Sequence, residues 1–450
     1  MSEPTQALAA FAATATIDTL SDDVRDSCKN LILDTLACAL AGQQGEETHQ
    51  VAALARALGQ SRESSVIGGD RLSLAGATLF NGYLITAVTM CDVHRETLTH
   101  ISPEIVPPAL AIAERDDCSG SDLLLAVALG CEVATRVGIG LDYPVFRRRG
   151  WHGPGVIGPF GAAAAVGSLR GFDTDTMARA YGLAGSQAAG TFAAWGTPTV
   201  KFHQCRAALS GLMAALLAEQ EFVATGEFLT AEDGGLYNTY VEGGLPDMVV
   251  ADLGSRWETQ RIALRPWPAA SLLQGQITAL FDLVRDNDVP FEAIDTVRIA
   301  LGDTPFAMHG GFAMYRAKFE ALLSAHYIAA VFLRDRKLTL AQYEADCYDD
   351  SALRSFAAER ITVEKDSSLQ GVQATAEVTL RDGSRVEARC EYPLGAPEYP
   401  LSRDQVEDKF RTYSRLRLPP ERIEPIIDMV GGLEQLDSAR KLVDMLRVDA

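Results

Sequence analysis

Residues 150–167 read GWHGPGVIGPFGAAAAVG, a turn rich in glycine and proline that leads into a run of small apolar residues. The small side chains predict a helix near residues 156–169 whose surface other helices can approach closely. His152 lies in the turn, so the backbone rather than a bulky neighbour positions its ring. This arrangement is typical of a functional site. It equally fits a structural histidine satisfied by a local carbonyl group at a helix start.

The first 260 residues around this stretch have the 3.6-residue periodicity of a helical protein. Ser21 followed by two aspartates marks one helix start, and Ser121 marks another. We expect helices near residues 22–42, 49–58, 73–90, 103–115, 122–139, 156–169, 175–188 and 207–224.

The pattern changes at Arg265-Pro266-Trp267-Pro268. Beyond it, residues 297–301 and 361–363 resemble strands, and residues 376–380 and 385–389 flank an Asp-Gly turn that predicts a β-hairpin. Helices are expected among them, near residues 272–285 and 318–333. The sequence therefore predicts a mainly α fold: a helical domain over residues 1–265, an inserted, smaller α+β domain over 266–402, and C-terminal helices over 403–450 that return to the helical domain.

The protein is acidic. Its 450 residues contain 60 Asp and Glu against 40 Lys and Arg, a formal net charge of −20. This charge argues against a nucleic acid partner and against binding to anionic membranes. The eight cysteines form no CxxC pair, which indicates a reducing, cytoplasmic location. Residues 72–91 are uncharged, but the polar residues among them favour a buried helix over a membrane span.

Several familiar catalytic motifs are absent, including GxGxxG after a strand, GxxxxGK[ST], HExxH and GxSxG in a strand–turn–helix context. No histidine pair has helical metal-ligand spacing with carboxylates nearby, so no metal site is predicted. The remaining candidates are His100, His152, Lys201, His203 and Tyr327. Histidine transfers protons near neutral pH, and lysine holds a carboxylate. The alternative for Lys201 is a solvated lysine in a loop before a helix, with no functional role.

Several segments, taken in order, resemble the MmgE/PrpD family. No single segment is specific, but together they span nearly the whole chain. They are DTLACALAG (34–42), Asn81-Gly82, His100 with VPPALA (106–111), Gly150-Trp151-His152, Gly196-Thr197 up to Lys201, Trp267-Pro268, and PLGAP (393–397) before Lys409-Phe410.

The resemblance implies a homodimer in which the α+β domain is a lid over the helical domain. It implies a small carboxylate substrate, with no metal and no organic cofactor. By position in the family motifs, the resemblance assigns catalytic roles to His152, His100, Lys201 and Tyr327. The candidate substrate contacts are Arg265, Asp92, Thr89, His203 and Trp151.

Two of these positions depart from the family pattern. Thr89 stands where the family has an acid, and Arg265 where it has a lysine. Losing the acid removes a negative charge that would favour protonated histidines. The change from lysine to arginine keeps the positive charge but replaces a compact ammonium group by a planar guanidinium group.

The function indicated is a cofactor-independent lyase of the dehydratase type, which abstracts a proton next to a carboxylate. An epimerase or isomerase keeps this proton abstraction and has no leaving group. A decarboxylase of a small dicarboxylate, marked by release of carbon dioxide, is another alternative. A family member that binds a ligand without catalysis is a further alternative, because fold does not fix function.

Overall fold

The computed structural model describes residues 3–311 and 315–448. The chain divides into two compact units, one formed by residues 1–264 with 402–450 and the other by residues 265–401. Helix accounts for 59% of the structure and strand for 9%, which confirms the mainly α class.

The first unit is helical apart from two short strand pairs, β1 (Ser64–Ser65) with β2 (Arg71–Leu72) and β3 (Val93–His94) with β4 (Ile262–Ala263). Its longer helices are α1 (Pro4–Thr14), α2 (Asp22–Gly42), α3 (Thr48–Ala57), α4 (Leu74–Thr86), α5 (Ser102–Asp116), α6 (Gly120–Gly140), α8 (Gly153–Leu169), α9 (Thr174–Gly185), α10 (Thr199–Glu219), α19 (Arg403–Ser414) and α20 (Ile423–Gly431). Shorter helices are α7 (Tyr143–Arg148), α11 (Leu236–Val241), α12 (Pro246–Val250) and α21 (Arg440–Leu446).

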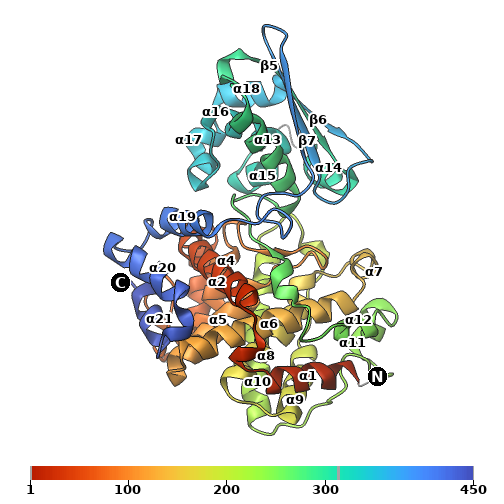
Figure 1. The fold of residues 1–450 in the computed structure, drawn as a ribbon, viewed down its shortest axis with the longest axis vertical. Coiled ribbons are helices and arrows are strands. Elements are labelled where there is room, and N and C mark those ends of the chain that lie inside the picture. The colour runs from red at the N-terminus through yellow and green to blue at the C-terminus, as the bar shows by residue number, and fades with distance from the viewer. Residues whose placement is uncertain (1–2, 312–314, 449–450) are drawn as a thin grey trace. The chain divides into compact units, whose positions relative to one another are not determined.

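Helix α8 lies at the centre of this unit and packs against α5, α6, α9 and α10 (Figure 1). Every residue from Gly153 to Gly167 is buried. A Cβ added at Gly161 would lie 2.4 Å from the carbonyl oxygen of Gly130 on α6, and one added at Gly211 on α10 would lie 2.3 Å from the Ala162 Cβ. The small residues of the opening stretch are therefore required because neighbouring helices approach the α8 backbone directly.

Helix α6 is long and apolar enough to cross a membrane by length and composition alone, but 94% of its most apolar window is buried inside the protein. It therefore has the environment of a core helix.

The C-terminal helices pack beside the N-terminal ones, and Figure 1 shows α19 and α20 in blue next to α2 in red. A buried ion pair joins them: Lys409 Nζ on α19 lies 2.6 Å from Asp34 Oδ1 on α2. Lys409 also donates to the carbonyl oxygen of Met90 at 3.2 Å. The C-terminal segment thus holds both α2 and the loop after α4.

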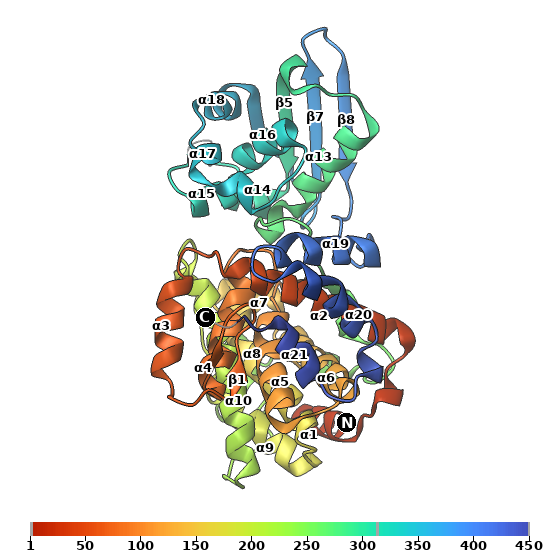
Figure 2. The same cartoon turned by 90° about the vertical axis from the view of Figure 1, so that its left-hand side faces the viewer.

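The second unit contains a four-stranded sheet in the order β6-β5-β7-β8, with helices packed on it (Figure 2). Its strands are β5 (Ile294–Leu301), β6 (Ile361–Lys365), β7 (Ala374–Leu380) and β8 (Arg385–Cys390). Strand β5 runs parallel to β6 and antiparallel to β7. Its helices are α13 (Gln274–Asp286), α14 (Asp303–His309), α15 (Lys318–Leu322), α16 (Ala325–Asp335), α17 (Ala345–Tyr348) and α18 (Ser351–Arg360).

Residues alternate between buried and more exposed positions along β7, and helices α13 and α16 cover the buried face. The predicted β-hairpin is confirmed: β7 and β8 pair antiparallel, and Gly383 adopts a φ of +88° in the turn between them. A positive φ favours glycine, as the Asp-Gly pair indicated.

Several predicted helix boundaries were wrong, and Ser119 rather than Ser121 caps α6. Helix α10 begins at Thr199 rather than near residue 207, because Pro198 already has helical dihedral angles and proline is tolerated at a helix start. Lys201 and His203 therefore lie on the helix and not in a loop. Helix α4 ends at Thr86, before Thr89 with its left-handed φ of +59°. The helix expected over residues 318–333 is divided into α15 and α16.

Candidate active site

His152 precedes α8, and backbone hydrogen bonds between residues 150–152 and residues 190–192 hold it in place. Its own N–H donates to the carbonyl oxygen of Gly190 at 3.0 Å, and the Phe192 N–H donates to that of Gly150 at 2.7 Å. Gly150 has a φ of +85°, which turns the chain out of α7 and into this pairing. The His152 side chain is only 9% exposed. The backbone thus fixes the ring at the start of α8, as the sequence indicated.

His203, on the second turn of α10, faces His152. The two Nδ1 atoms lie 2.9 Å apart, a hydrogen-bond distance. Gly190 permits this approach, because a Cβ there would lie 3.1 Å from His203 Nδ1. Glycine also suits the φ of +139° at that position. The structure therefore brings together two histidines that sequence spacing separates by 51 residues.

This contact determines the tautomers of the pair. One Nδ1 must donate and the other must accept, so when both rings are neutral they are opposite tautomers. One ring then has an acceptor lone pair on Nε2, and the other has an N–H donor there. The His152–His203 pair therefore offers a base and an acid together, and the choice between the two assignments depends on what binds.

The surroundings keep both rings neutral. Burial lowers the pKa of His152 to about 3, and electrostatic repulsion from His203, His100 and Arg147 acts in the same direction. Burial, followed by the charge of Arg206, also lowers the pKa of His203. Near pH 7 the pair is therefore neutral, which a proton acceptor requires.

His100 is close enough to His152 for its charge to affect the pKa of that ring. Its Nδ1 donates to the carbonyl oxygen of Asp92 at 2.7 Å, which leaves the lone pair of the neutral ring on Nε2. The carboxylate of Asp92 accepts the N–H groups of Ile101 at 2.9 Å and Ser102 at 3.1 Å. Asp92, predicted as a substrate contact, is buried and caps α5, so it positions His100 through its backbone.

Lys201 lies in the first turn of α10, with its ammonium group buried. Nζ donates to the carbonyl oxygen of Ala87 at 2.7 Å and lies 3.5 Å from the carboxylate of Glu47, which also accepts the Tyr83 hydroxyl at 2.9 Å. Lys201 thus holds the segment that carries half-buried Thr89. Glu47 had no signal in the sequence, because it lies in an ordinary polar loop.

Aromatic side chains line the space beside His152. Phe192 is 5.8 Å from the His152 ring and stacks on Trp195 at 5.2 Å, and the Arg147 guanidinium lies 3.4 Å from the Phe192 ring centroid. Trp151, a predicted substrate contact, packs on Tyr240 at 4.5 Å. One cation from the Arg147–Arg149 run is therefore held close to the histidines by a cation–π contact.

A buried carboxyl group lies near this cluster and was not predicted. Glu104 of α5 is 1% exposed, and neither side-chain oxygen has a hydrogen-bond partner within the described chain. Burial, followed by the negative charge of Asp92, raises its pKa well above the usual range. Its protonated form is therefore favoured. A glutamate two residues after a helix start is ordinary in sequence, so no pattern marked it.

Arg265 and Tyr327 belong to the second unit, where each has local partners. Arg265 is 2% exposed and donates through Nη1 to the carbonyl oxygen of Ala269 at 3.0 Å. The Tyr327 hydroxyl donates to the carbonyl oxygen of Gln342, between the rings of Tyr315 and Tyr343. Their predicted roles toward a substrate stay predictions.

Among residues 3–311 and 315–448, no three His, Cys, Asp or Glu side chains come together as potential metal ligands. The side chains gathered in the first unit are suited to proton transfer beside an anionic group: neutral imidazoles with Arg147 near them. The chain is therefore a mainly helical protein, and its buried histidine pair is a candidate acid–base site.

Comparisons with known proteins agree with this class. The MmgE/PrpD N-terminal domain matches residues 6–248, and the MmgE/PrpD C-terminal domain matches residues 267–435. Together the two matches cover most of the chain, which therefore belongs to the MmgE/PrpD family, as the ordered motifs predicted.

Several similar proteins are named as decarboxylases. Cis-aconitate decarboxylase-like protein oryM of Aspergillus oryzae is 29% identical, over 94% of this chain and 93% of its own length. Cis-aconitate decarboxylase of Aspergillus terreus is 27% identical, over 97% and 94%. The human protein of the same name is 26% identical, over 95% and 91%.

Proposed function

We propose that this protein is a lyase that acts on a small di- or tricarboxylate, and that decarboxylation is its reaction. The observation that carries the proposal is the contact between His152 and His203, a neutral pair that offers an acid and a base at hydrogen-bond distance. The names of the relatives, all cis-aconitate decarboxylases or similar to them, favour loss of carbon dioxide over the loss of water expected from the sequence.

Decarboxylation requires little more than this pair. The bond between the substrate carbon and its carboxylate breaks, carbon dioxide leaves, and the electron pair stays on the carbon, delocalised into a neighbouring unsaturated carboxylate. A proton from the Nε2–H of the His152–His203 pair then completes the product. A nearby cation such as Arg147 stabilises the negative charge that develops before this proton transfer.

Dehydration uses the same groups in different roles. An Nε2 lone pair removes a proton from the substrate, and the acid protonates the leaving hydroxyl group. Epimerisation needs only the proton transfer. The protein's independence of a cofactor, its homodimeric state, its cytoplasmic location and the lid role of the α+β unit are further parts of the proposal.

The experiment is to incubate the purified protein with cis-aconitate and, separately, with citrate, and to follow carbon dioxide release and product NMR spectra. We expect carbon dioxide and a one-carbon-shorter product from cis-aconitate. Loss of water from citrate would favour the dehydratase. Exchange of solvent deuterium into recovered citrate would show proton abstraction without elimination, the step on which an epimerase depends. Stabilisation against heat without turnover of either acid would identify a binding protein.

A further inference from the structure

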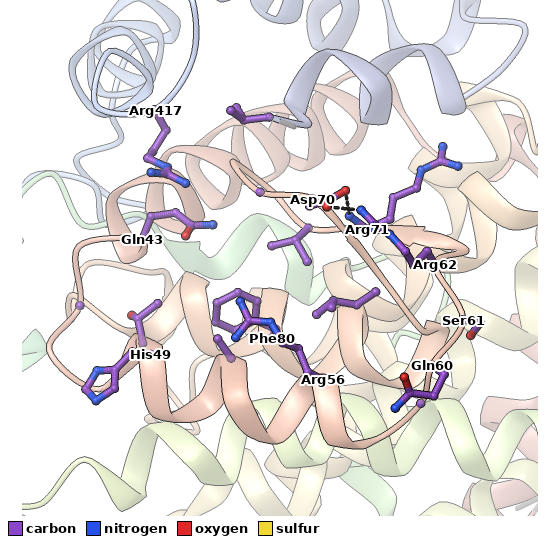
Figure 3. A pocket seen from close by; sticks show the side chains of 18 residues that line it. Gln43, His49, Arg56, Gln60, Ser61, Arg62, Asp70, Arg71, Phe80 and Arg417 are labelled. Atoms are coloured by element: carbon purple, nitrogen blue, oxygen red, sulfur yellow. Dashed lines mark hydrogen bonds and ion pairs between the residues drawn. The ribbon is translucent and has the colours of Figure 1, made fainter. Parts of the chain in front are cut away.

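A cavity of about 680 Å³ opens in the first unit, between α3, the β1–β2 segment and the C-terminal segment (Figure 3). None of the histidines of the candidate active site lines it. It is therefore a separate site, whose lining residues the proposed reaction does not use.

The charge of this cavity is opposite to that of the whole protein. Among the residues that the structure describes, its lining has four arginines and one carboxylate, on a chain with a net charge of −20. The charged and titratable residues of the lining are His49, Arg56, Arg62, Asp70, Arg71 and Arg417. A local excess of positive charge on an acidic protein attracts anions at short range that the molecule repels at long range.

Two of the four arginines are already neutralised. Arg62 pairs with Asp70, and Arg71 lies 3.1 Å from the carboxylate of Glu114 and 3.6 Å from that of Asp444.

Arg417 differs, because it donates to the carbonyl oxygen of Gly68, at 3.2 Å through Nε and 2.9 Å through Nη2. A carbonyl group orients a guanidinium without cancelling its charge. Arg56 is exposed on α3, and within the part of the chain that the structure describes neither Arg56 nor Arg417 pairs with a carboxylate.

The floor between the charges is apolar. Figure 3 shows Phe80 near the middle, with Arg56 in front of it, Arg417 and Gln43 on one side, and Arg62 and Arg71 on the other. Phe80 is only 7% exposed, and Ala52, Val66 and Leu72 line the cavity with it. A ligand that fits has a flat, apolar body and anionic groups at its ends, because guanidinium groups bind phosphate and carboxylate through paired hydrogen bonds.

We propose that this cavity binds a small organic polyanion, with a planar body over Phe80 and phosphate or carboxylate groups on Arg56 and Arg417. Three probes separate the possible sources of the anionic groups. ATP has a ring and phosphates, inorganic tripolyphosphate has phosphates alone, and citrate has carboxylates without a ring.

The test measures binding of each probe by isothermal titration calorimetry to the full-length protein, without added metal. We expect saturable binding of ATP that is tighter than that of tripolyphosphate or citrate. Combining Arg56→Ala with Arg417→Ala should weaken ATP binding by about tenfold to a hundredfold, since each lost charge-assisted hydrogen bond contributes appreciably. Arg56→Ala alone, at an exposed position without a structural bond, should weaken it less but measurably.

A matched control removes two exposed arginines from the hairpin of the second unit, Arg381→Ala with Arg385→Ala, and should leave ATP binding unchanged. The His152→Gln variant should also bind ATP normally, which separates this site from the proposed catalytic one. The proposal is overturned if no probe binds saturably, if the control weakens binding as much as the cavity variant, or if His152→Gln abolishes it. A change of oligomeric state in Arg56→Ala, measured by light scattering, would instead identify the cavity as a contact between copies and would also overturn it.

Discussion

Titratable side chains are neutral or paired in the interior of this protein, whereas on its surface they are charged and solvated. In the interior, His152 and His203 are neutral and contact each other, and Lys409 faces Asp34 at 2.6 Å. On the surface, arginines such as Arg56 keep a solvated charge, and ion pairs such as Lys365 with Asp303, at 3.6 Å, are more than half exposed. Buried groups therefore fix positions and protonation states, whereas exposed ion pairs contribute little to stability.

The largest expected effect is on catalysis. His152→Gln should lower the turnover of cis-aconitate by about a hundredfold to ten-thousandfold, the usual contribution of general acid–base catalysis. His203→Gln should have a similar effect. The double variant should lose little more than either single one, because the two rings act as one unit. Steady-state kinetics, with unfolding temperatures as a check on folding, measure this. Additive losses would contradict the paired role.

The next effect is on stability. Lys409→Met leaves the Asp34 carboxylate buried and without its cation, so we expect a loss of about 3–5 kcal/mol of unfolding free energy. Urea denaturation followed by circular dichroism measures it. A loss below about 1 kcal/mol would show that water or a rearranged neighbour replaces the cation.

An intermediate effect depends on pH. The pKa of His152 is about 3 in the folded protein against 6.5 for the free side chain, so the unfolded chain takes up a proton first as the pH falls. The free energy of unfolding should therefore decrease as the pH falls from 6.5 to about 3. Above pH 6.5 this group should contribute nothing to the pH dependence. Between pH 6.5 and 5.0 the contribution is roughly 2 kcal/mol. His152→Gln should remove that part of the slope in urea denaturation at the two pH values. An unchanged slope would mean that the ring is hydrated.

The smallest effect is the surface counterpart of the Lys409 variant. Lys365→Met removes an ion pair whose side chains are 54% and 64% exposed, and the expected loss is less than about 1 kcal/mol, with turnover unchanged. The same denaturation and kinetic measurements apply. A loss equal to that of Lys409→Met would show that exposed and buried ion pairs contribute equally to stability, which would contradict the comparison.

The periodic features of the fold could be predicted from the sequence. The apolar stripe of α2, the small residues of α8 and the Asp-Gly turn between β7 and β8 each have a local cause, so local reasoning found them. The start of α10 was missed because Pro198 reads as a loop residue although it is compatible with a first helical turn. The chain alone could not determine that boundary.

The site was predictable only in part. The position of His152 follows from its turn, and the order of motifs indicated His100 and Lys201. The contact between His152 and His203 depends on how α8 and α10 pack and on the absence of a side chain at Gly190, which no sequence spacing encodes. Glu47 and Glu104 became visible only through their burial and their partners. Long-range packing therefore determines the part of the site that sequence reasoning missed.

The pairing of Asp34 with Lys409 also has a consequence for biosynthesis. The two residues lie 375 positions apart, so the ribosome exposes α2 long before the helix that supplies its counter-charge exists. The segment 265–401 is continuous and can complete its own structure as soon as it has emerged. The helical unit stays incomplete, with apolar surface exposed, until residues 402–450 are translated. Protein made from messages truncated before residue 402 should therefore depend on chaperones and be degraded.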